Sequence, residues 1–270
     1  MQSELENKLL LSIITVCRND AKRLQITIDS LRDFYEDAKF EHIVVDGEST
    51  DETSALIRSL LNKANFKFYS ERDYGIYDAM NRGVMYSRAP LLLFLNCGDT
   101  LIASPGDLSA CLFQLVARDG MVDLDIACFP VRQIGAKGAR TIVPTVLAQN
   151  KMPVSHQGMV FASRFVQQNE YQISYRIAGD FDLYLRAGRV GVFADPPCGP
   201  LVAVEVEGVA STNPIKAYSE YVAVACRRLR GRSRVAAILL IVIRALCVIP
   251  AKKLLPKRWI AAIRGCHGGF

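Results

Sequence analysis

The stretch LLSIITVCRNDAKRLQITIDSLRDFYEDAKFEHIVVDGEST, residues 10–50, decides the fold. It opens with a short apolar run at residues 10–17, rich in β-branched side chains, which is typical of a buried parallel strand. Residues 23–35 then carry apolar side chains at helical spacing, and a second strand at residues 41–45 ends at Asp46. A strand, a helix and another strand in this order predict an α/β fold with a doubly wound, mostly parallel sheet flanked by helices.

The same alternation continues along the chain. An S-x-x-E pattern at residues 49–52 predicts a capping box and a helix that reaches residue 61. A third strand is expected at 66–70, a helix at 75–87 and a fourth strand at 91–95. The second half of the chain predicts strands at 125–131, 159–161, 190–195 and 201–206, and a helix at 182–187.

Polar residues gather where the predicted strands end. They follow the first strand at 18–20, the second at 46–48 and the fourth at 96–99. Open α/β sheets bind their ligands beyond the carboxyl ends of the strands. The sequence therefore predicts one shared site at this edge of the sheet.

The C-terminal part of the chain has a distinct charge pattern. Residues 216–270 hold twelve of the 33 Lys and Arg residues but only one of the 27 acids, a net charge of +11 within a chain of +6. Apolar residues are interleaved with these charges, without the stacking aromatics that nucleic-acid tails use, so no nucleic-acid partner is expected. The apolar run 235–249 is shorter than the roughly 20 residues that span a bilayer. We therefore expect a tail, 214–270, that lies on an anionic membrane surface; the alternative is a helix that packs on the body.

Cysteine usage and the N-terminus indicate the compartment. The eight cysteines include no C-x-x-C pair, which argues against a zinc site and favours free thiols in a reducing compartment. Residues 1–8 lack the basic-then-apolar order of a signal peptide. We expect a cytoplasmic protein, peripheral on the inner face of the cytoplasmic membrane.

Four acids are candidates for the chemistry. Asp46 is placed to bond a nucleobase or ribose, or else to cap a helix. Asp99, helped by Asn96, would hold a divalent cation on a diphosphate, or else only shape a turn. Either Asp180 or Asp182, at the start of a predicted helix, would act as a general base, or else stabilise the helix N-terminus.

Seven motifs, in order, resemble family 2 glycosyltransferases with the GT-A fold. The last three are similar to the bacterial exopolysaccharide branch, notably the colanic acid biosynthesis glycosyltransferases. The seven are LLSIITVCRN (10–19), IVVDGESTDET (43–53), YSERDYGIYDAMNRG (69–83), LLLFLNCGD (91–99), PVSHQGMVF (153–161), ISYRIAGDFDLYLRAG (173–188) and GVASTNP (208–214).

The resemblance implies an inverting transfer from a UDP- or GDP-sugar, with Mg²⁺ or Mn²⁺ on the diphosphate, to a polyprenyl-diphosphate-linked saccharide. It implies that Asp46 contacts the nucleoside, Asp99 the metal, and that Asp180 is the catalytic base. It also implies further residues around the donor, the diphosphate and the acceptor, namely Asp73, Asp78, Asn81, Arg82, Asn96, His156 and Gln157.

The sequence departs from the family pattern at two places. Many members carry a second acid where Gly47 follows Asp46, and the metal motif is reduced to residues 96–99 with one carboxylate. Two rival functions remain in other classes. A sugar nucleotidyltransferase would need a glycine-rich loop after the first strand, and residues 17–20 contain no glycine. The other rival is a non-catalytic membrane-associated binding protein of the same fold.

We divide the chain into a catalytic domain, 1–213, and the tail, 214–270. Within the catalytic domain, the nucleotide-binding part is expected at about 8–120 and the acceptor part at about 121–213.

Overall fold

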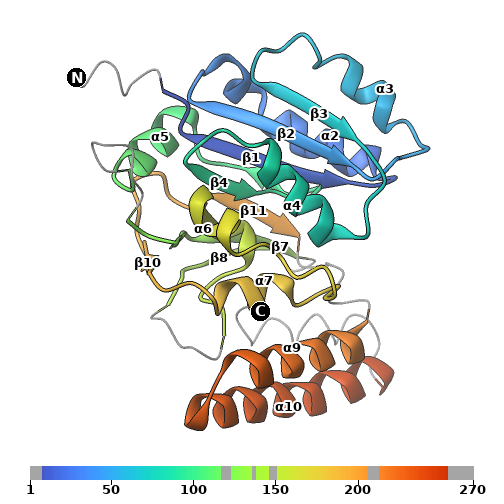
Figure 1. Cartoon of the computed structure of the whole chain (residues 1–270), viewed down its shortest axis with the longest axis vertical. Coiled ribbons are helices and arrows are strands. Elements are labelled where there is room, and N and C mark those ends of the chain that lie inside the picture. The colour runs from blue at the N-terminus through green and yellow to red at the C-terminus, as the bar shows by residue number, and fades with distance from the viewer. Residues whose placement is uncertain (1–7, 117–122, 136–137, 146–150, 206–212, 255–270) are drawn as a thin grey trace.

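A seven-stranded sheet organises the body of the molecule (Figure 1). The computed structural model describes residues 8–116, 123–135, 138–145, 151–205 and 213–254. In spatial order the strands are β10 (Val190–Val192), β6 (Ile126–Cys128), β9 (Met159–Ala162), β4 (Leu91–Phe94), β1 (Leu11–Cys17), β2 (Phe40–Asp46) and β3 (Phe66–Ser70). All neighbours pair in parallel except β9, which runs antiparallel to both β4 and β6. The predicted mostly parallel sheet is confirmed.

Helices cover both faces of this sheet. In Figure 1, α2 and α3 lie on one face, whereas α4 and α6 lie on the other. The helical elements of the body are α2 (Ala21–Ser30), η1 (Arg32–Glu36), α3 (Thr53–Arg58), α4 (Ile76–Tyr86), α5 (Pro105–Phe113), η2 (His156–Gly158), α6 (Ser163–Gln168) and α7 (Gly179–Tyr184).

Burial on both faces explains why β1 and β2 are apolar runs rather than alternating patterns. Their few polar side chains are paired inside the sheet. The ring nitrogens of His42 lie 2.8 Å from the Tyr35 hydroxyl and 3.0 Å from the Thr15 hydroxyl. Burial lowers the pKa of His42 to about 3, so this ring is neutral and structural.

A second, four-stranded sheet was not predicted. Its strands, in spatial order, are β5 (Thr100–Leu101), β11 (Val202–Glu205), β7 (Val131–Gly135) and β8 (Gly138–Ile142). The single strand expected at 125–131 is divided between β6 and β7, because Pro130 has no N–H to donate to a ladder and marks the change of sheet.

The capping box predicted at residues 49–52 is wrong. Helix α3 begins at Thr53, and its N-cap position, Glu52, makes no side-chain cap. The hydroxyl of Ser49 instead donates to the carboxylate of Asp46, which is fully buried and needs donors. The Ser49 hydroxyl therefore bonds the buried Asp46 carboxylate instead of capping helix α3.

The C-terminal helices form a hairpin on one end of the body. Helix α9 (Pro214–Arg228) contacts α7, and α10 (Gly231–Leu254) packs along α9 (Figure 1). Asn213 caps α9 by accepting from the N–H of Lys216 at 3.2 Å. Over the ranges that the structure covers, no helix combines the length and apolarity needed to cross a bilayer.

Candidate active site

The reversed strand β9 builds the site. Because β9 runs against β4, with Leu93 opposite Val160, the residues just before β9 arrive where the chain leaves β4. His156 and Gln157 therefore meet the turn at residues 96–99. Asp46 ends β2 at the same edge, since its Cα partner is Cys17 at the end of β1.

Helix α2 fixes the turn after β4. The Thr27 hydroxyl donates to the carbonyl of Asp99 at 2.8 Å and accepts from the N–H of Gly98 at 3.0 Å. Gly98 has a positive φ of 88°, and a Cβ there would lie 2.6 Å from the Nε of Arg23. The turn requires glycine because of its backbone conformation, and any side chain there would also displace the guanidinium of Arg23.

Asp99 is the buried acid of the site. Asp99 is only 4% exposed, and its Oδ2 accepts a hydrogen bond from the Nε2 of Gln157 at 2.9 Å. Burial raises the pKa of Asp99 to about 6, although Gln157, His156 and Arg23 act in the opposite direction. Asp99 thus favours a nearby positive charge, which would relieve the cost of its ionisation.

His156 connects the turn to Asp180. Its Nδ1 lies 3.4 Å from the Oδ2 of Asp180, and its Nε2 lies 3.3 Å from the Nδ2 of Asn96. The side chains of His156 and Asp180 are 15% and 14% exposed, so neither is fully buried. The Oδ1 of Asp180 accepts from the N–H of Phe181 at 2.9 Å and lies 3.5 Å from the hydroxyl of Tyr77. Five predicted residues therefore meet in one network, namely Asn96, Asp99, His156, Gln157 and Asp180.

Asp46 lies at the same edge but outside this network. Its carboxylate accepts from the N–H and hydroxyl of Ser49 and from the hydroxyl of Ser70, the last at 2.7 Å. In this arrangement Asp46 shapes the loop after β2, and its contact with a nucleoside stays a prediction.

Asp73 occupies the space beside Gly47. A Cβ on Gly47 would lie 2.3 Å from the Oδ2 of Asp73 and 3.2 Å from the Cδ of Arg18. The Oδ1 of Asp73 accepts from the N–H of Gly75 at 2.8 Å. A carboxylate from a later loop thus stands next to the position where the family pattern has its second acid.

The other predicted donor residues make contacts within the body. Arg82 pairs with Glu71 at 2.7 Å and with Asp78 at 3.2 Å. Asn81 binds the backbone of Tyr171 with both ends of its amide, at 2.8 and 2.9 Å. None of these contacts joins the Asp99–Asp180 network.

Oxygen ligands for a cation occur in the turn. In the ranges described, no cluster of three or more His, Cys, Asp or Glu side chains could hold a metal ion. The Oδ1 of Asn96, however, is buried without a hydrogen-bond partner in the same turn as the Asp99 carboxylate. These two oxygens fit a hard cation that takes its remaining ligands from phosphate and water.

Two functional candidates escaped the sequence analysis. The guanidinium of Arg23 lies against Gly98, next to Asp99, and is therefore a cation close to that acid. It also lies 3.7 Å from the carboxylates of Asp20 and Glu205. Glu220 contacts the backbone that leads to Asp180. The sequence does mark Glu220 as the only acid of the basic tail, but nothing in the sequence identifies its partners.

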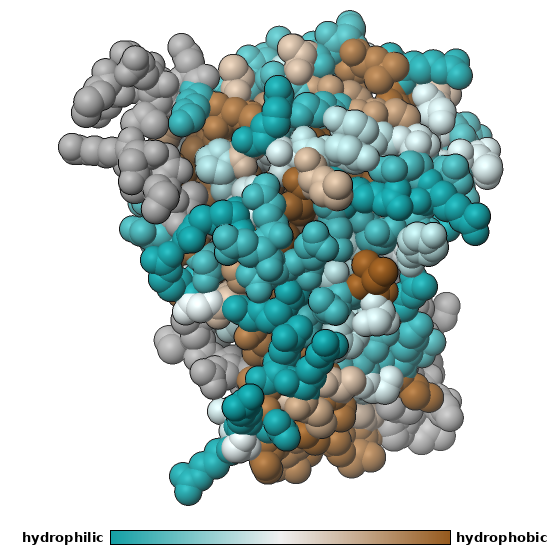
Figure 2. All heavy atoms as spheres, viewed as in Figure 1, coloured by the Kyte–Doolittle hydropathy of each residue, from teal (hydrophilic) through white to brown (hydrophobic). Residues whose placement is uncertain are grey.

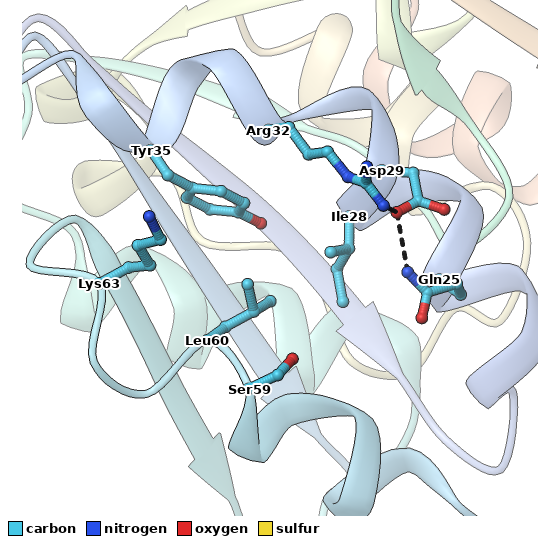
Figure 3. Close-up of a pocket in the computed structure, with 8 residues that line it drawn as sticks. All are labelled: Gln25, Ile28, Asp29, Arg32, Tyr35, Ser59, Leu60 and Lys63. Atoms are coloured by element: carbon cyan, nitrogen blue, oxygen red, sulfur yellow. Dashed lines mark hydrogen bonds and ion pairs between the residues drawn. The ribbon is translucent and has the colours of Figure 1, made fainter.

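A separate cavity of about 380 Å³ lies between α2 and the residues after α3 (Figure 3). Its charges are already paired, because Asp29 accepts from Arg32 at 2.7 Å and from Gln25 at 2.9 Å. It contains none of the predicted site residues.

The ionisation of Asp99 predicts a pH-dependent stability. With a pKa of about 6 in the folded chain and about 3.9 in the unfolded chain, the folded state binds more protons between these values. The free energy of unfolding should therefore fall as pH rises from about 4 to about 6. Asp99→Asn removes this loss, so the variant should gain on the order of 2 kcal/mol over wild type across this range. Urea unfolding with EDTA at a series of pH values measures it, and a difference that does not change with pH would contradict the assignment.

Comparison with known proteins gives consistent results. The family model "Glycosyl transferase family 2" matches residues 12–129. An uncharacterized glycosyltransferase of Mycobacterium tuberculosis is 33% identical over 184 residues, which cover 66% of this chain and 69% of the relative. A PGL/p-HBAD biosynthesis glycosyltransferase of the same species is 30% identical over 183 residues, with the same coverage of 66% and 69%.

Solved structures show the same architecture. S. aureus TarS in complex with UDP-GlcNAc has a TM-score of 0.60 and 18% identity, covering 87% of this chain and 72% of that chain. The mannosyltransferase PcManGT from Pyrobaculum calidifontis, in complex with GDP-Man and Mn²⁺, has a TM-score of 0.61 and 15% identity, covering 95% and 78%. The predicted GT-A fold is confirmed.

Proposed function

The chain belongs to glycosyl transferase family 2, and on that premise we propose that it moves a sugar, with inversion, from a UDP- or GDP-sugar to a lipid-linked saccharide. Membership makes it a glycosyltransferase that uses nucleotide sugars, which sets aside the nucleotidyltransferase and the non-catalytic protein. The acceptor, the residue roles and the membrane site are the proposal.

The proposed roles of Asp99 and Asp180 are supported mainly by one observation. Asp99 is bonded to Gln157, and the preceding residue, His156, contacts Asp180. A buried acid suited to a cation and a second, partly exposed acid thus lie on either side of one short segment. A donor whose diphosphate is held near Asp99 would present its sugar toward Asp180.

In the proposed mechanism Asp180 takes the proton from an acceptor hydroxyl as that oxygen attacks the anomeric carbon. The hydroxyl approaches from the face opposite the leaving diphosphate, so the configuration inverts. His156 orients the carboxylate through its Nδ1, and Asn96 holds the other ring nitrogen. The pocket must also exclude water, because water at the acceptor position would only hydrolyse the donor.

Asp99 and Asn96 would hold the cation, with Gln157 keeping the Asp99 carboxylate in place. Mg²⁺ or Mn²⁺ bound there would neutralise charge on the departing nucleoside diphosphate. PcManGT, a structural neighbour of this chain, was solved with GDP-Man and Mn²⁺.

For the nucleoside we propose the surface around Gly47, where the side chains of Arg18, after β1, and Asp73, after β3, both lie next to the glycine. Asp46 supports this surface by holding the loop after β2 through Ser49 and Ser70. Asp78, Asn81 and Arg82 support it less directly, by fixing helix α4 and the segment at Tyr171.

The acceptor would be a polyprenyl-diphosphate-linked saccharide, as in bacterial exopolysaccharide or colanic acid synthesis. The support is the outer face of α10, which exposes large apolar side chains at one-face helical spacing: Val235 (65%), Leu239 (58%), Val242 (41%), Ile243 (49%) and Leu246 (69%). Figure 2 shows this apolar surface at the end of the molecule formed by the helical hairpin. Exposed Arg227, Arg230 and Arg232 precede it in the sequence. An apolar face next to cations suits the anionic inner surface of the cytoplasmic membrane.

For the division of the chain we propose one change, which contacts of α9 support. Helix α9 is bonded to α7 through Glu220 and Arg228. We therefore propose that α9 works with the catalytic domain 1–213, and that within the tail 214–270 it is α10 that contacts the membrane. The motif at 208–214 lies mostly outside the described residues, as do the basic residues after 254.

Donor binding tests the proposed function. A panel of UDP- and GDP-sugars, including UDP-GlcNAc and GDP-Man, would be screened by thermal shift with and without Mn²⁺. A donor at a hundred times its Kd should add about 2.7 kcal/mol of stability, and Asp99→Asn should remove the part that depends on Mn²⁺. If no nucleotide sugar stabilises the protein under any of these conditions, the proposal fails.

Membrane binding gives a separate prediction. Replacing Leu239, Ile243 and Leu246 together by Gln should weaken binding to vesicles with about one third phosphatidylglycerol by about tenfold or more, because each apolar side chain buried in the interface contributes. Co-sedimentation measures it, with pure phosphatidylcholine vesicles for comparison. Leu61→Gln with Met85→Gln, at residues 59% and 76% exposed on the body, is the matched control. Equal binding of all three proteins would contradict the role of α10.

A further inference from the structure

Helix α9 holds the backbone that leads into α7. The carboxylate of Glu220 accepts hydrogen bonds from three successive N–H groups, those of residues 176–178, at 2.7 to 3.1 Å. Its Oε2 takes part in all three contacts. Since residue 178 is the N-cap of α7, this one side chain from the tail fixes the chain two residues before Asp180.

The same segment is held from the opposite side by α4. The hydroxyl of Tyr77 donates to the carbonyl of Ile177 at 2.7 Å and lies 3.5 Å from the Oδ1 of Asp180. Tyr77 in turn stacks on Tyr171, with ring centroids 5.2 Å apart. The peptide before α7 therefore gives its N–H groups to α9 and a carbonyl to α4, which fixes both its position and its rotation.

Side-chain contacts continue along α9. The ring of Tyr221 packs edge-on against Phe181 at a centroid distance of 5.6 Å, and both residues are buried. Two turns further on, Arg228 binds the fully buried carboxylate of Asp182 at 2.7 and 3.1 Å. Phe181 and Asp182 directly follow Asp180, so α9 contacts the chain on both sides of that residue.

Among the α9 side chains that contact the chain around Asp180, Glu220 forms the strongest contact with the backbone before it. Hydrogen bonds to an ionised carboxylate are shorter and stronger than neutral ones. Glu220 is also the only acid in residues 216–270, so no neighbouring carboxylate in the tail could replace it. The carboxylate of Asp180 itself has few fixed contacts, chiefly the N–H of Phe181 and the ring of His156.

We propose that Glu220 is a positioning residue for catalysis, which holds Asp180 at the distance and angle that proton transfer from the acceptor requires. The docked helix α9 is then part of the active site rather than a passive connection to the membrane helix. This inference rests on the proposed role of Asp180 as the base. It adds a requirement that the base alone does not impose, namely that the tail be docked for turnover.

Four full-length variants test the proposal: Glu220→Ala, Glu220→Gln, Asp180→Asn and the control Ser219→Ala, at an exposed position next to Glu220. Initial rates of UDP or GDP release from UDP-GlcNAc and GDP-Man would be measured with n-octyl glycosides as soluble acceptors. Circular dichroism and thermal unfolding give the folded fraction, to which each rate is normalised.

Glu220→Ala should lower kcat about 100-fold, because a displacement near 1 Å at a reacting group costs about that much. The KM for the donor should stay within about threefold, since the Asp99 turn lies on other elements. Glu220→Gln should recover about a tenfold part of the loss, because its amide oxygen can still accept from two of the three N–H groups, those of Ile177 and Ala178. Ser219→Ala should behave as wild type.

The outcomes separate this inference from the proposed function. Normal kcat in folded Glu220→Ala, with Asp180→Asn inactive, overturns the positioning role and leaves the base assignment intact. Equal losses in Glu220→Ala and Glu220→Gln that vanish on normalisation to folded protein also overturn it, since they indicate a structural role alone. Normal transfer by Asp180→Asn would show that Asp180 is not the base, and the inference about Glu220, which rests on that role, would then fail as well.

Discussion

Replacing Asp180 by Asn is expected to lower the kcat of sugar transfer about a thousandfold, because an amide cannot accept the proton of the acceptor hydroxyl. The substitution keeps the shape of the side chain. The amide oxygen can still accept from the N–H of Phe181, which bonds to the Oδ1 of Asp180 at 2.9 Å. Donor affinity should therefore be unchanged, and the loss should fall on kcat rather than on KM.

The measurement is steady-state transfer together with the thermal shift produced by the donor. Asp107→Asn is the matched control, because Asp107 is also an acid in the first turn of a helix but lies exposed on α5. If Asp180 only stabilised its helix N-terminus, both variants would lose about 0.3–1 kcal/mol of stability and neither would lose activity. That result would place the base elsewhere.

The second large effect is on stability. Asp182 is fully buried and binds two guanidinium groups, those of Arg186 at 3.1 Å and Arg228 at 2.7 Å. Asp182→Ala leaves both cations without this partner. Removing one member of a buried pair costs about 3–5 kcal/mol, and the lower end applies here because the arginine side chains are 12% and 24% exposed.

Urea or thermal unfolding measures this loss, which should appear as a decrease in Tm of about 6–12 °C. Asp123→Ala is the control, since Asp123 is 85% exposed and lies 3.8 Å from Arg189. An exposed pair of this kind contributes about 0–1 kcal/mol. Equal Tm values for the two variants would show that the buried pairs do not stabilise the docked tail.

The sequence predicted the strands and helices of the first half well, because apolar runs buried on both faces leave an unambiguous pattern. It failed at Ser49, where capping of a helix competed with a buried carboxylate from the preceding strand. It also missed the small sheet, whose members include the two-residue strand Thr100–Leu101. Such a strand exists only because β11 from a distant segment pairs with it, and no local signal encodes that pairing.

For the site, strand ends predicted a shared edge for residues 18–20, 46–48 and 96–99, whereas the placement of His156, Gln157 and Asp180 followed only from the family resemblance; the structure places these three beside the turn at 96–99. Asn81 shows the limit of this reasoning. Its amide binds the backbone of Tyr171 at both ends, a contact across 90 positions that its motif gives no reason to expect. Glu220 is similar, because its partners are backbone groups, which carry no side-chain signature in the sequence.

The reversed strand β9 has a consequence for how such proteins diversify. Backbone pairing with β4 on one side and β6 on the other delivers His156 and Gln157 to the turn at 96–99. Within the intervening chain, about 100–155, segments other than β6 can accordingly accept insertions or exchanges without separating residues 156–157 from the turn. New acceptor preferences can arise there while the chemistry inherited at the edge of the sheet stays intact.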